Sequence, residues 1–172
     1  MELSRRILLK SSLAGLATSA VSIQGSLVQS VPPAHFVDVD GIRTRYFESG
    51  QGENLVLIHG GRFGFPSYSA DVWGLNLDGL GKYFHVYAFD KLGQGYTDNP
   101  KSDKDYTKRA YVQHAYGFIR AMGMERASLV GHSMGAMVAA RIALEHPELV
   151  ENLIVLDSNT LAPRDPSTPP DF

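Results

Sequence analysis

The sequence contains no cysteine. Disulfide scaffolds, zinc ribbons, iron–sulfur centres and cysteine nucleophiles are therefore excluded together. An excess of one charge is also missing, because 16 Lys and Arg stand against 18 Asp and Glu and give a formal charge of -2. This balance offers no basic surface for a phosphate backbone, so we expect no nucleic-acid partner.

Motifs for metals and nucleotides are missing too. The 6 histidines are dispersed and none lies in an H-E-x-x-H pattern, so no metal site is expected. Two G-Q-G segments, at 50–52 and 93–95, lack the third glycine of a dinucleotide loop, and neither precedes Gly-Lys-Ser/Thr. We therefore expect no cofactor. With 172 residues, 44% of them hydrophobic, the chain can bury one core.

The N-terminus resembles a twin-arginine export signal. Residues 1–10 read M-E-L-S-R-R-I-L-L-K, against the pattern S-R-R-x-F-L-K. The following stretch 13–28 is interrupted by polar residues and is shorter than the ~20 apolar residues of a membrane-spanning helix. We expect a signal over residues 1–30 and a periplasmic or secreted protein without a stable membrane span after signal removal. The alternative is a cytoplasmic chain in which Arg5 and Arg6 are solvated.

Hydrophobic patterning predicts strands. Two β-rich runs, 36–39 and 42–48, flank the dipeptide Asp40-Gly41, which is a strong signal for an antiparallel hairpin. Unbroken apolar runs, which are typical of strands covered on both faces, follow at 55–58, 85–90, 129–131 and 153–156.

Helical spacing occurs between these runs. Apolar residues from Tyr111 to Met122 recur at i, i+4, i+7 and i+11, and Gly123 can end that helix. A second helix is predicted over 134–146, before Pro147. Alternating strands and helices indicate an α/β fold with a mostly parallel, doubly wound sheet. We expect residues 31–160 to form the N-terminal part of the core of this fold, and the Pro-rich segment 161–172 has no periodic pattern.

The sharpest signal for chemistry is G-H-S-M-G at 131–135, between an apolar strand and a predicted helix. A serine nucleophile must stand clear of the backbone, and a tight strand-to-helix turn presents Ser133 in that way. Glycine at Gly131 and Gly135 avoids a collision between strand and helix. The Met134 amide, at the helix N-terminus, is a candidate oxyanion donor.

The second oxyanion donor is expected after the strand 55–58, in the segment H-G-G-R. Glycines there let backbone amides approach a substrate oxygen closely. We predict Gly61 as the donor, with Arg62 as the alternative. An ordinary strand-to-loop turn explains the two glycines equally well when they are taken alone.

Together these segments resemble the α/β-hydrolase superfamily. The matching positions, in chain order, are His59, Gly60, Asp90, Gly93, Gly95 and Ser133. The wording of D-K-L-G-Q-G-Y-T-D-N-P and V-G-H-S-M-G is most similar to the meta-cleavage-product hydrolases, which split carbon–carbon bonds in dienoates. The resemblance implies a serine hydrolase acting on a small carbonyl substrate, either an ester or a dienoate. Esterases, lipases and cofactor-free haloperoxidases share these motifs.

Other polar residues have structural interpretations. Asp90 ends a strand before turn residues, so we expect it to order the 93–95 loop. His59 and His132 are expected to pack or to line the pocket. His114 and His146 are expected to be exposed on helices.

Two interpretations stay open for the side chains that follow the H-G-G-R segment. Arg62 is either solvated or a ligand for a substrate carboxylate. Phe65, Tyr68 and Trp73 are either pocket walls or core residues.

The resemblance also implies a triad acid and a histidine after Ser133, with a cap domain between them. No histidine follows His146. We therefore expect the chain to be the N-terminal portion of a longer hydrolase, C-terminally incomplete and inactive alone, with 161–172 as a tail or the start of the cap. Asp157 is an alternative acid.

Two other functions remain for this sequence. One is a haloperoxidase-like perhydrolase that uses Ser133. The other is a noncatalytic remnant or binding module that keeps the fold without the triad.

The arginine pair yields a first prediction. If residues 1–30 are a twin-arginine signal, replacing Arg5 and Arg6 by lysines should stop export, which cell fractionation measures. Unchanged accumulation outside the cytoplasm would contradict the assignment.

Overall fold

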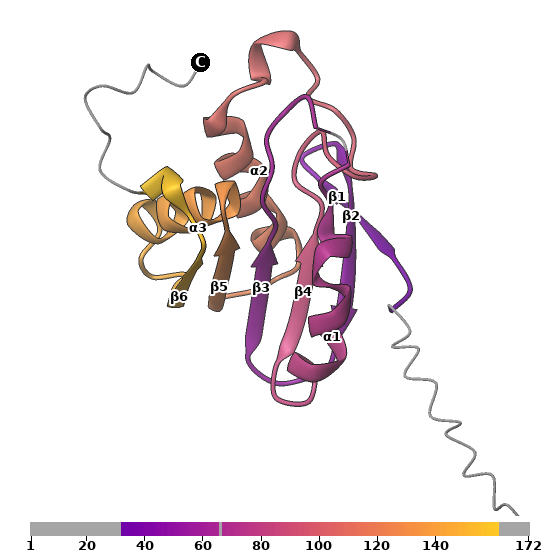
Figure 1. The fold of residues 1–172 in the computed structure, drawn as a ribbon, viewed down its shortest axis with the longest axis vertical. Helices are drawn as coiled ribbons and strands as arrows, with labels where there is room; N and C mark the ends of the chain where they lie inside the picture. Colours follow the sequence, from indigo (N-terminus) through magenta and orange to yellow (C-terminus); the bar gives the residue numbers. More distant parts are fainter. Residues whose placement is uncertain (1–31, 66, 162–172) are drawn as a thin grey trace, which may run out of the picture.

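The computed structural model describes residues 32–65 and 67–161. The predicted signal over 1–30 and the segment 162–172 lie outside the described residues. In the described part, a 6-stranded sheet has the order β1-β2-β4-β3-β5-β6 (Figure 1). Within these ranges no helix is long and apolar enough to cross a membrane.

The sheet begins with the predicted hairpin. Strands β1 (His35–Val39) and β2 (Ile42–Ser49) pair antiparallel. The turn residues Asp40 and Gly41 have φ values of 52° and 77°, as a two-residue turn of this type requires. The Gly41 N–H donates to Asp38 Oδ1 at 2.8 Å and closes the turn.

The remaining strands make the sheet mostly parallel. Strand β2 pairs antiparallel with β4, whereas the β3–β4, β3–β5 and β5–β6 pairs are parallel. These strands are β3 (Asn54–Ile58), β4 (His85–Phe89), β5 (Ala127–His132) and β6 (Val150–Leu156). The fold class predicted from the sequence is therefore confirmed.

Two of the helices were predicted and one was not. Helix α2 (Lys108–Ala121) has Thr107 as its N-cap residue, and the Thr107 hydroxyl accepts a hydrogen bond from the Ala110 N–H. Helix α3 (Met134–Glu145) ends before Pro147. Helix α1 (Gly74–Leu80) follows a short 3-10 turn. It has only 7 residues and two glycines, so it carries no periodic apolar pattern that would predict it.

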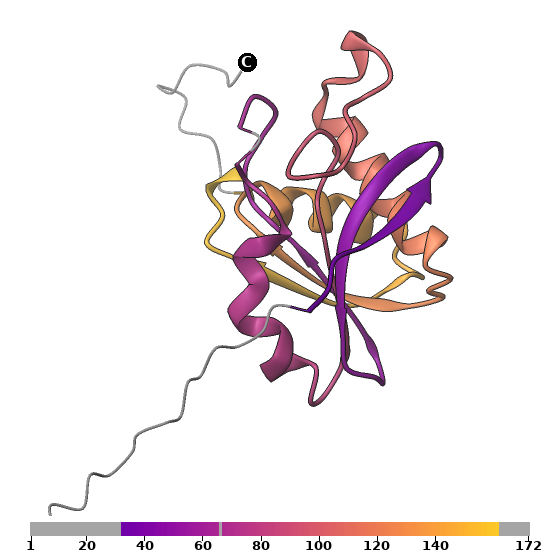
Figure 2. The same cartoon turned by 90° about the vertical axis from the view of Figure 1, so that its right-hand side faces the viewer.

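The helices cover both faces of the sheet. Figure 2 shows α1 on one side and α2 and α3 on the other. Val56 and Ile58 pack on the α2 and α3 side, whereas Leu55 and Leu57 pack on the α1 side with Trp73. This two-sided burial explains the unbroken apolar run of β3, and it places Trp73 in the core.

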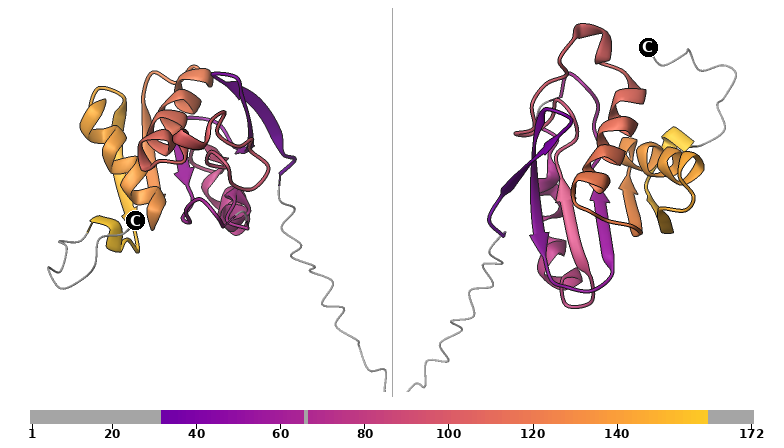
Figure 3. Two further views of the ribbon diagram at one scale, coloured as in Figure 1. Left: turned by 90° about the horizontal axis from the view of Figure 1, so that it is seen from above. Right: turned by 180° about the vertical axis from the view of Figure 1, so that it is seen from behind.

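The β1–β2 hairpin lies beside α2, as the view from behind in Figure 3 shows. Gly117 permits the contact, because a Cβ there would lie 2.8 Å from Val39 Cγ1. The predicted exposure of His114 is wrong for the same reason. Its side chain faces the hairpin and the residue is only 6% exposed.

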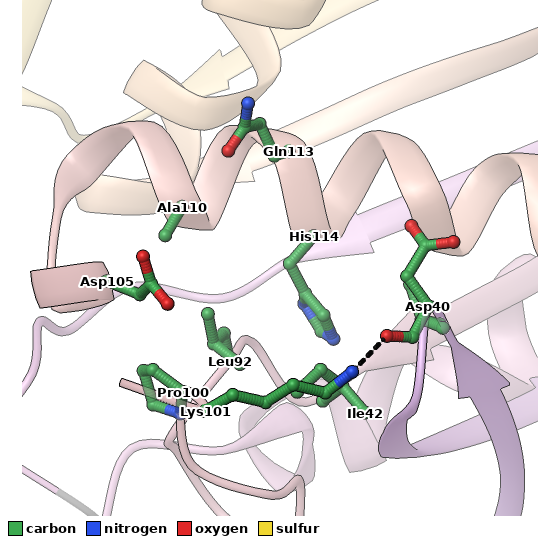
Figure 4. Close-up of a pocket in the computed structure, with 10 residues that line it drawn as sticks. Asp40, Ile42, Leu92, Pro100, Lys101, Asp105, Ala110, Gln113 and His114 are labelled. Atoms are coloured by element: carbon green, nitrogen blue, oxygen red, sulfur yellow. Dashed lines mark hydrogen bonds between the residues drawn. The ribbon is translucent and has the colours of Figure 1, made fainter. Parts of the chain in front are cut away.

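The His114 ring extends from α2 beside a cavity of about 290 Å³, across which Lys101 donates to the Asp40 carbonyl at 2.7 Å (Figure 4). His114 Nε2 lies 2.8 Å from Thr44 Oγ1, which itself donates to a carbonyl, so Nε2 carries the proton. Burial lowers the pKa of His114 to about 4, and the ring is neutral.

His146 is half-buried and stacks on Tyr116, with ring centroids 3.9 Å apart.

Among the described residues, the outer edge of strand β6 is unpaired, as the family's strand order implies for this N-terminal portion of the fold. The strand lies at the sheet edge and, within the described ranges, pairs only with β5. Leu153, Ile154, Val155 and Leu156 are between 37% and 43% exposed. An exposed apolar edge is a template for pairing with another chain.

We therefore predict that residues 31–172, produced alone, self-associate through β6. Leu153→Lys should reduce the self-association, because an edge lysine opposes strand pairing. Leu75→Lys, on the exposed surface of α1, is the matched control and should have no effect. Analytical ultracentrifugation measures both, and a monomeric, cooperatively melting wild-type fragment would contradict the prediction.

Candidate active site

Ser133 stands at a strained turn between β5 and α3. Its φ of 52° and ψ of -117° lie in a region that L residues rarely occupy. The Ser133 N–H donates to the Leu156 carbonyl of β6 at 3.0 Å. The turn therefore has the backbone geometry expected of a nucleophile elbow.

The glycines on either side of the turn permit close approach of three elements. A Cβ on Gly131 would lie 2.4 Å from Ala136 Cα, inside α3. A Cβ on Gly135 would lie 2.1 Å from the Ile58 carbonyl oxygen at the end of β3. The first contact is the strand-to-helix collision that the sequence predicts, and the second joins the elbow to β3.

A cavity of about 520 Å³ brings the predicted site residues together. Gly61, His132, Ser133, Met134 and Asp157 all line it. The volume lies within the range of small-molecule sites. Met134 is the first residue of α3, so its N–H has no acceptor within the helix.

His59 holds the second candidate donor in place. It is fully buried, and its Nε2 accepts the Lys91 N–H at 3.1 Å. The proton is therefore on Nδ1, which donates to the Gly60 carbonyl at 2.8 Å. Burial, reinforced by the charge of Lys91, lowers the pKa of His59 to about 3. Because a trans peptide points its N–H opposite its C=O, this bond sets the direction of the Gly61 N–H.

Lys91 is a functional candidate that the sequence did not reveal. Its side chain is fully buried, and Nζ donates to the Gly61 carbonyl at 2.6 Å. Nζ also lies 4.5 Å from the centroid of the Tyr111 ring. Burial lowers the pKa of Lys91 to about 7. A lysine after a strand is ordinarily solvated, so nothing local predicted this contact.

Asp90 is fully buried and binds backbone and side-chain donors. It accepts from Arg45 Nε at 2.7 Å, from the Ala70 N–H at 2.7 Å and from the Tyr96 N–H at 2.8 Å. A Cβ on Gly95 would lie 2.2 Å from Asp90 Oδ2. These bonds fit a role in ordering the 93–95 loop.

The 93–95 loop also contacts the segment after β3. Gly93 has a φ of 68°, and a Cβ there would lie 3.2 Å from the Phe63 ring. Gln94 Nε2 donates to the Arg62 carbonyl at 3.1 Å. The 93–95 loop is therefore joined to the segment after β3, part of which lines the cavity.

Aromatic and charged side chains form one wall of the cavity. Arg62, Phe65 and Tyr68 line it, and the Arg62 guanidinium carbon lies 5.6 Å from the Phe65 ring centroid. A Cβ on Gly61 would lie 2.4 Å from Tyr68 Cγ, so Tyr68 packs directly on that glycine. The structure thus assigns Phe65 and Tyr68 to the pocket.

Among the residues of the cavity, Ser133 carries a hydroxyl and Asp157 carries a carboxylate. In the described ranges, no side chain forms a hydrogen bond with Ser133 Oγ. Asp157 follows β6 with a φ of 41° and lines the same cavity as Ser133. Ser133, Met134, Gly61 and Asp157 therefore line one cavity.

The family assignment follows from comparison with known proteins. Residues 54–172 match the family described as the alpha/beta hydrolase fold, and the chain belongs to this family. The resemblance to meta-cleavage product hydrolases is confirmed.

Two curated relatives and one solved structure are informative. A 2-hydroxy-6-oxo-6-(2'-aminophenyl)hexa-2,4-dienoic acid hydrolase of Metapseudomonas resinovorans is 37% identical over 72% of this chain and 41% of its own length. A 2-hydroxymuconate semialdehyde hydrolase of Pseudomonas sp. (strain CF600) is 39% identical over 69% of this chain and 41% of its own length. A crystallised serine hydrolase involved in carbazole degradation has a TM-score of 0.69 and 33% identity, covering 76% of this chain and 49% of that chain. The chain thus spans less than half the length of these relatives.

The buried Lys91 yields a prediction about pH. Its pKa falls from 10.5 in the unfolded chain to about 7 in the fold, so between these values the unfolded chain binds more protons. The free energy of unfolding should therefore rise with pH in this window, by up to about 1.4 kcal/mol per pH unit from this group.

Lys91→Met should abolish this contribution, and Lys82→Met, on an exposed turn, should retain it. Urea unfolding of the three proteins at pH 6 to 10 measures the difference. A constant free-energy difference between wild type and Lys91→Met from pH 7 to 9 would contradict the assignment.

Proposed function

We propose that the complete protein is a serine hydrolase in which Ser133 attacks a carbonyl carbon of a small substrate. The observation that carries the proposal is the strained Ser133 in a cavity that Met134 and Gly61 also line. Similarity to hydrolases of a dienoic acid and of a semialdehyde supports a dienoate or an ester as the substrate class.

The reaction would proceed by acyl transfer. The oxygen of Ser133 bonds to the carbonyl carbon while its proton passes to a base. The family order places that base, a histidine, later in the chain than Ser133. The carbonyl oxygen becomes an oxyanion that accepts hydrogen bonds from the backbone N–H groups of Met134 and Gly61. The scissile C–O or C–C bond then breaks, the leaving group takes the proton, and water hydrolyses the acyl-serine.

Arg62 is proposed as a specificity residue of this site. It lines the cavity with Ser133, and a guanidinium can bind a carboxylate through two hydrogen bonds. Such a contact would favour substrates that carry a carboxylate at the end remote from the scissile bond.

The test is labelling by a fluorophosphonate probe. The complete protein should react at Ser133, and Ser133→Ala should lose labelling and reduce turnover by a factor on the order of 10⁶. Ser128→Ala removes a hydroxyl that accepts from Asn152 at the far end of β5, and it should keep both activities. An unlabelled complete protein would remove Ser133 as nucleophile and favour a binding module.

Two further proteins locate the acid and the base. Residues 1–172 alone should label weakly, because an oxyanion hole without a base retains only about 10³ to 10⁴-fold acceleration over water. Strong labelling of this chain would show that the base lies within it. Asp157→Asn in the complete protein should have little effect if a later acid orients the histidine, and should reduce turnover by orders of magnitude if Asp157 is the triad acid.

A further inference from the structure

Two hydroxyls converge on the carbonyl of the nucleophile. Ser158 Oγ donates to the Ser133 carbonyl at 2.8 Å, and Thr160 Oγ1 lies 3.2 Å from the same oxygen. The two hydroxyl oxygens are 2.6 Å apart. Each hydroxyl has one proton to donate, and the contact between the two hydroxyls uses at most one of the two protons. At least one hydroxyl therefore donates to the Ser133 carbonyl.

The second bond in this group strengthens the first. When Ser158 donates to the carbonyl it can accept from Thr160, and such chains of hydrogen bonds polarise one another. The Ala136 N–H also donates to the Ser133 carbonyl, at 3.0 Å. The carbonyl is thus held by the first turn of α3 and by the segment that follows β6.

The position of this carbonyl determines the direction of an oxyanion donor. The Ser133 carbonyl and the Met134 N–H belong to one trans peptide and point in opposite directions. Fixing the carbonyl therefore fixes the Met134 N–H. A donor that needs no reorientation during the reaction stabilises an oxyanion most effectively.

The backbone around Ser133 is held on both sides by the same stretch of chain. The Ser133 N–H donates to the Leu156 carbonyl at the end of β6. The Ser133 carbonyl accepts from the hydroxyls of Ser158 and Thr160, which follow β6. A strained φ and ψ persist only where the surroundings over-determine them. These bonds supply that constraint.

We propose that Ser158 and Thr160 are positioning residues, here named the hydroxyl clamp, which hold the Ser133 carbonyl and so orient the Met134 amide as an oxyanion donor. The inference rests on the proposed function, because it assigns a role in the same reaction. It identifies two positions, outside the G-x-S-x-G motif, on which turnover depends.

The competing explanation is purely structural. The two hydroxyls would then satisfy the short 3-10 turn Asn159–Leu161, and the Ala136 N–H alone would hold the carbonyl. On that view, removing the hydroxyls lowers thermal stability and leaves the turnover of the folded enzyme unchanged.

The experiment compares four variants of the complete protein with wild type. The double variant Ser158→Ala/Thr160→Val removes both hydroxyls and nearly preserves shape. Ser158→Thr and Thr160→Ser keep a hydroxyl at each position. Ser128→Ala is the matched control, because it also removes one hydrogen-bonded serine hydroxyl next to β6.

Hydrolysis of a p-nitrophenyl ester gives kcat and KM, and thermal melting reports folding. The double variant should lose about 10 to 100-fold in kcat with KM within about 2-fold, because a misdirected oxyanion donor weakens transition-state binding. Thr160 also lines the cavity, so a rise in KM with an unchanged kcat would indicate a lost substrate contact and would overturn the clamp. The two conservative variants should remain within a few-fold of wild type, and Ser128→Ala should keep wild-type kcat. A crystal structure of the double variant should show that Ser133 ψ has moved from -117°.

Support for the clamp requires both the fall in kcat and the rotation of the peptide, and the absence of either overturns it. If wild type shows no turnover that depends on Ser133, the proposed function is wrong. The conformational part of the clamp is then decided by Ser133 ψ in the double variant, where an unchanged angle refutes it. If the double variant does not fold, the single variants Ser158→Ala and Thr160→Val carry the same comparison.

Discussion

The left-handed conformation of Ser133 is the constraint on which the rest of the site depends. A residue with a side chain at this φ is unfavourable by itself, so the surroundings must hold it. Gly131 and Gly135 permit the approach of β5, α3 and the end of β3. Hydrogen bonds from Ser133 to the β6 segment complete the enclosure. Ser133 is therefore positioned by three parallel strands and one helix.

Buried polar groups help to order the loop opposite the elbow. His59 binds the Gly60 carbonyl and Lys91 binds the Gly61 carbonyl. Asp90 binds Arg45 and the backbone N–H groups of two loops. Most of these groups satisfy one another, which is the condition for burying them at acceptable cost. Lys91 is the exception, since its ammonium meets a carbonyl and an aromatic ring but no carboxylate among the described residues.

The two sides of the site follow one design. On the side of the Ser133 turn, Ser158 binds the Ser133 carbonyl, which belongs to the same peptide as the Met134 N–H. On the loop side, His59 holds the Gly60 carbonyl and the same peptide presents the Gly61 N–H. Backbone donors oriented in this way need no charged side chain to stabilise an oxyanion. This arrangement is what the proposed reaction at a carbonyl group requires.

The sequence by itself determined the α/β class, the hairpin, helices α2 and α3 and the elbow, because each depends on a local pattern. Apolar periodicity, the Asp40-Gly41 turn and the glycines around Ser133 act within a few residues. Only the tertiary structure decided the burial of His114, the contact of Lys91 with Gly61 and the approach of Ser158 to the Ser133 carbonyl. Each of these depends on which distant segments become neighbours, and spacing along the chain does not contain that information.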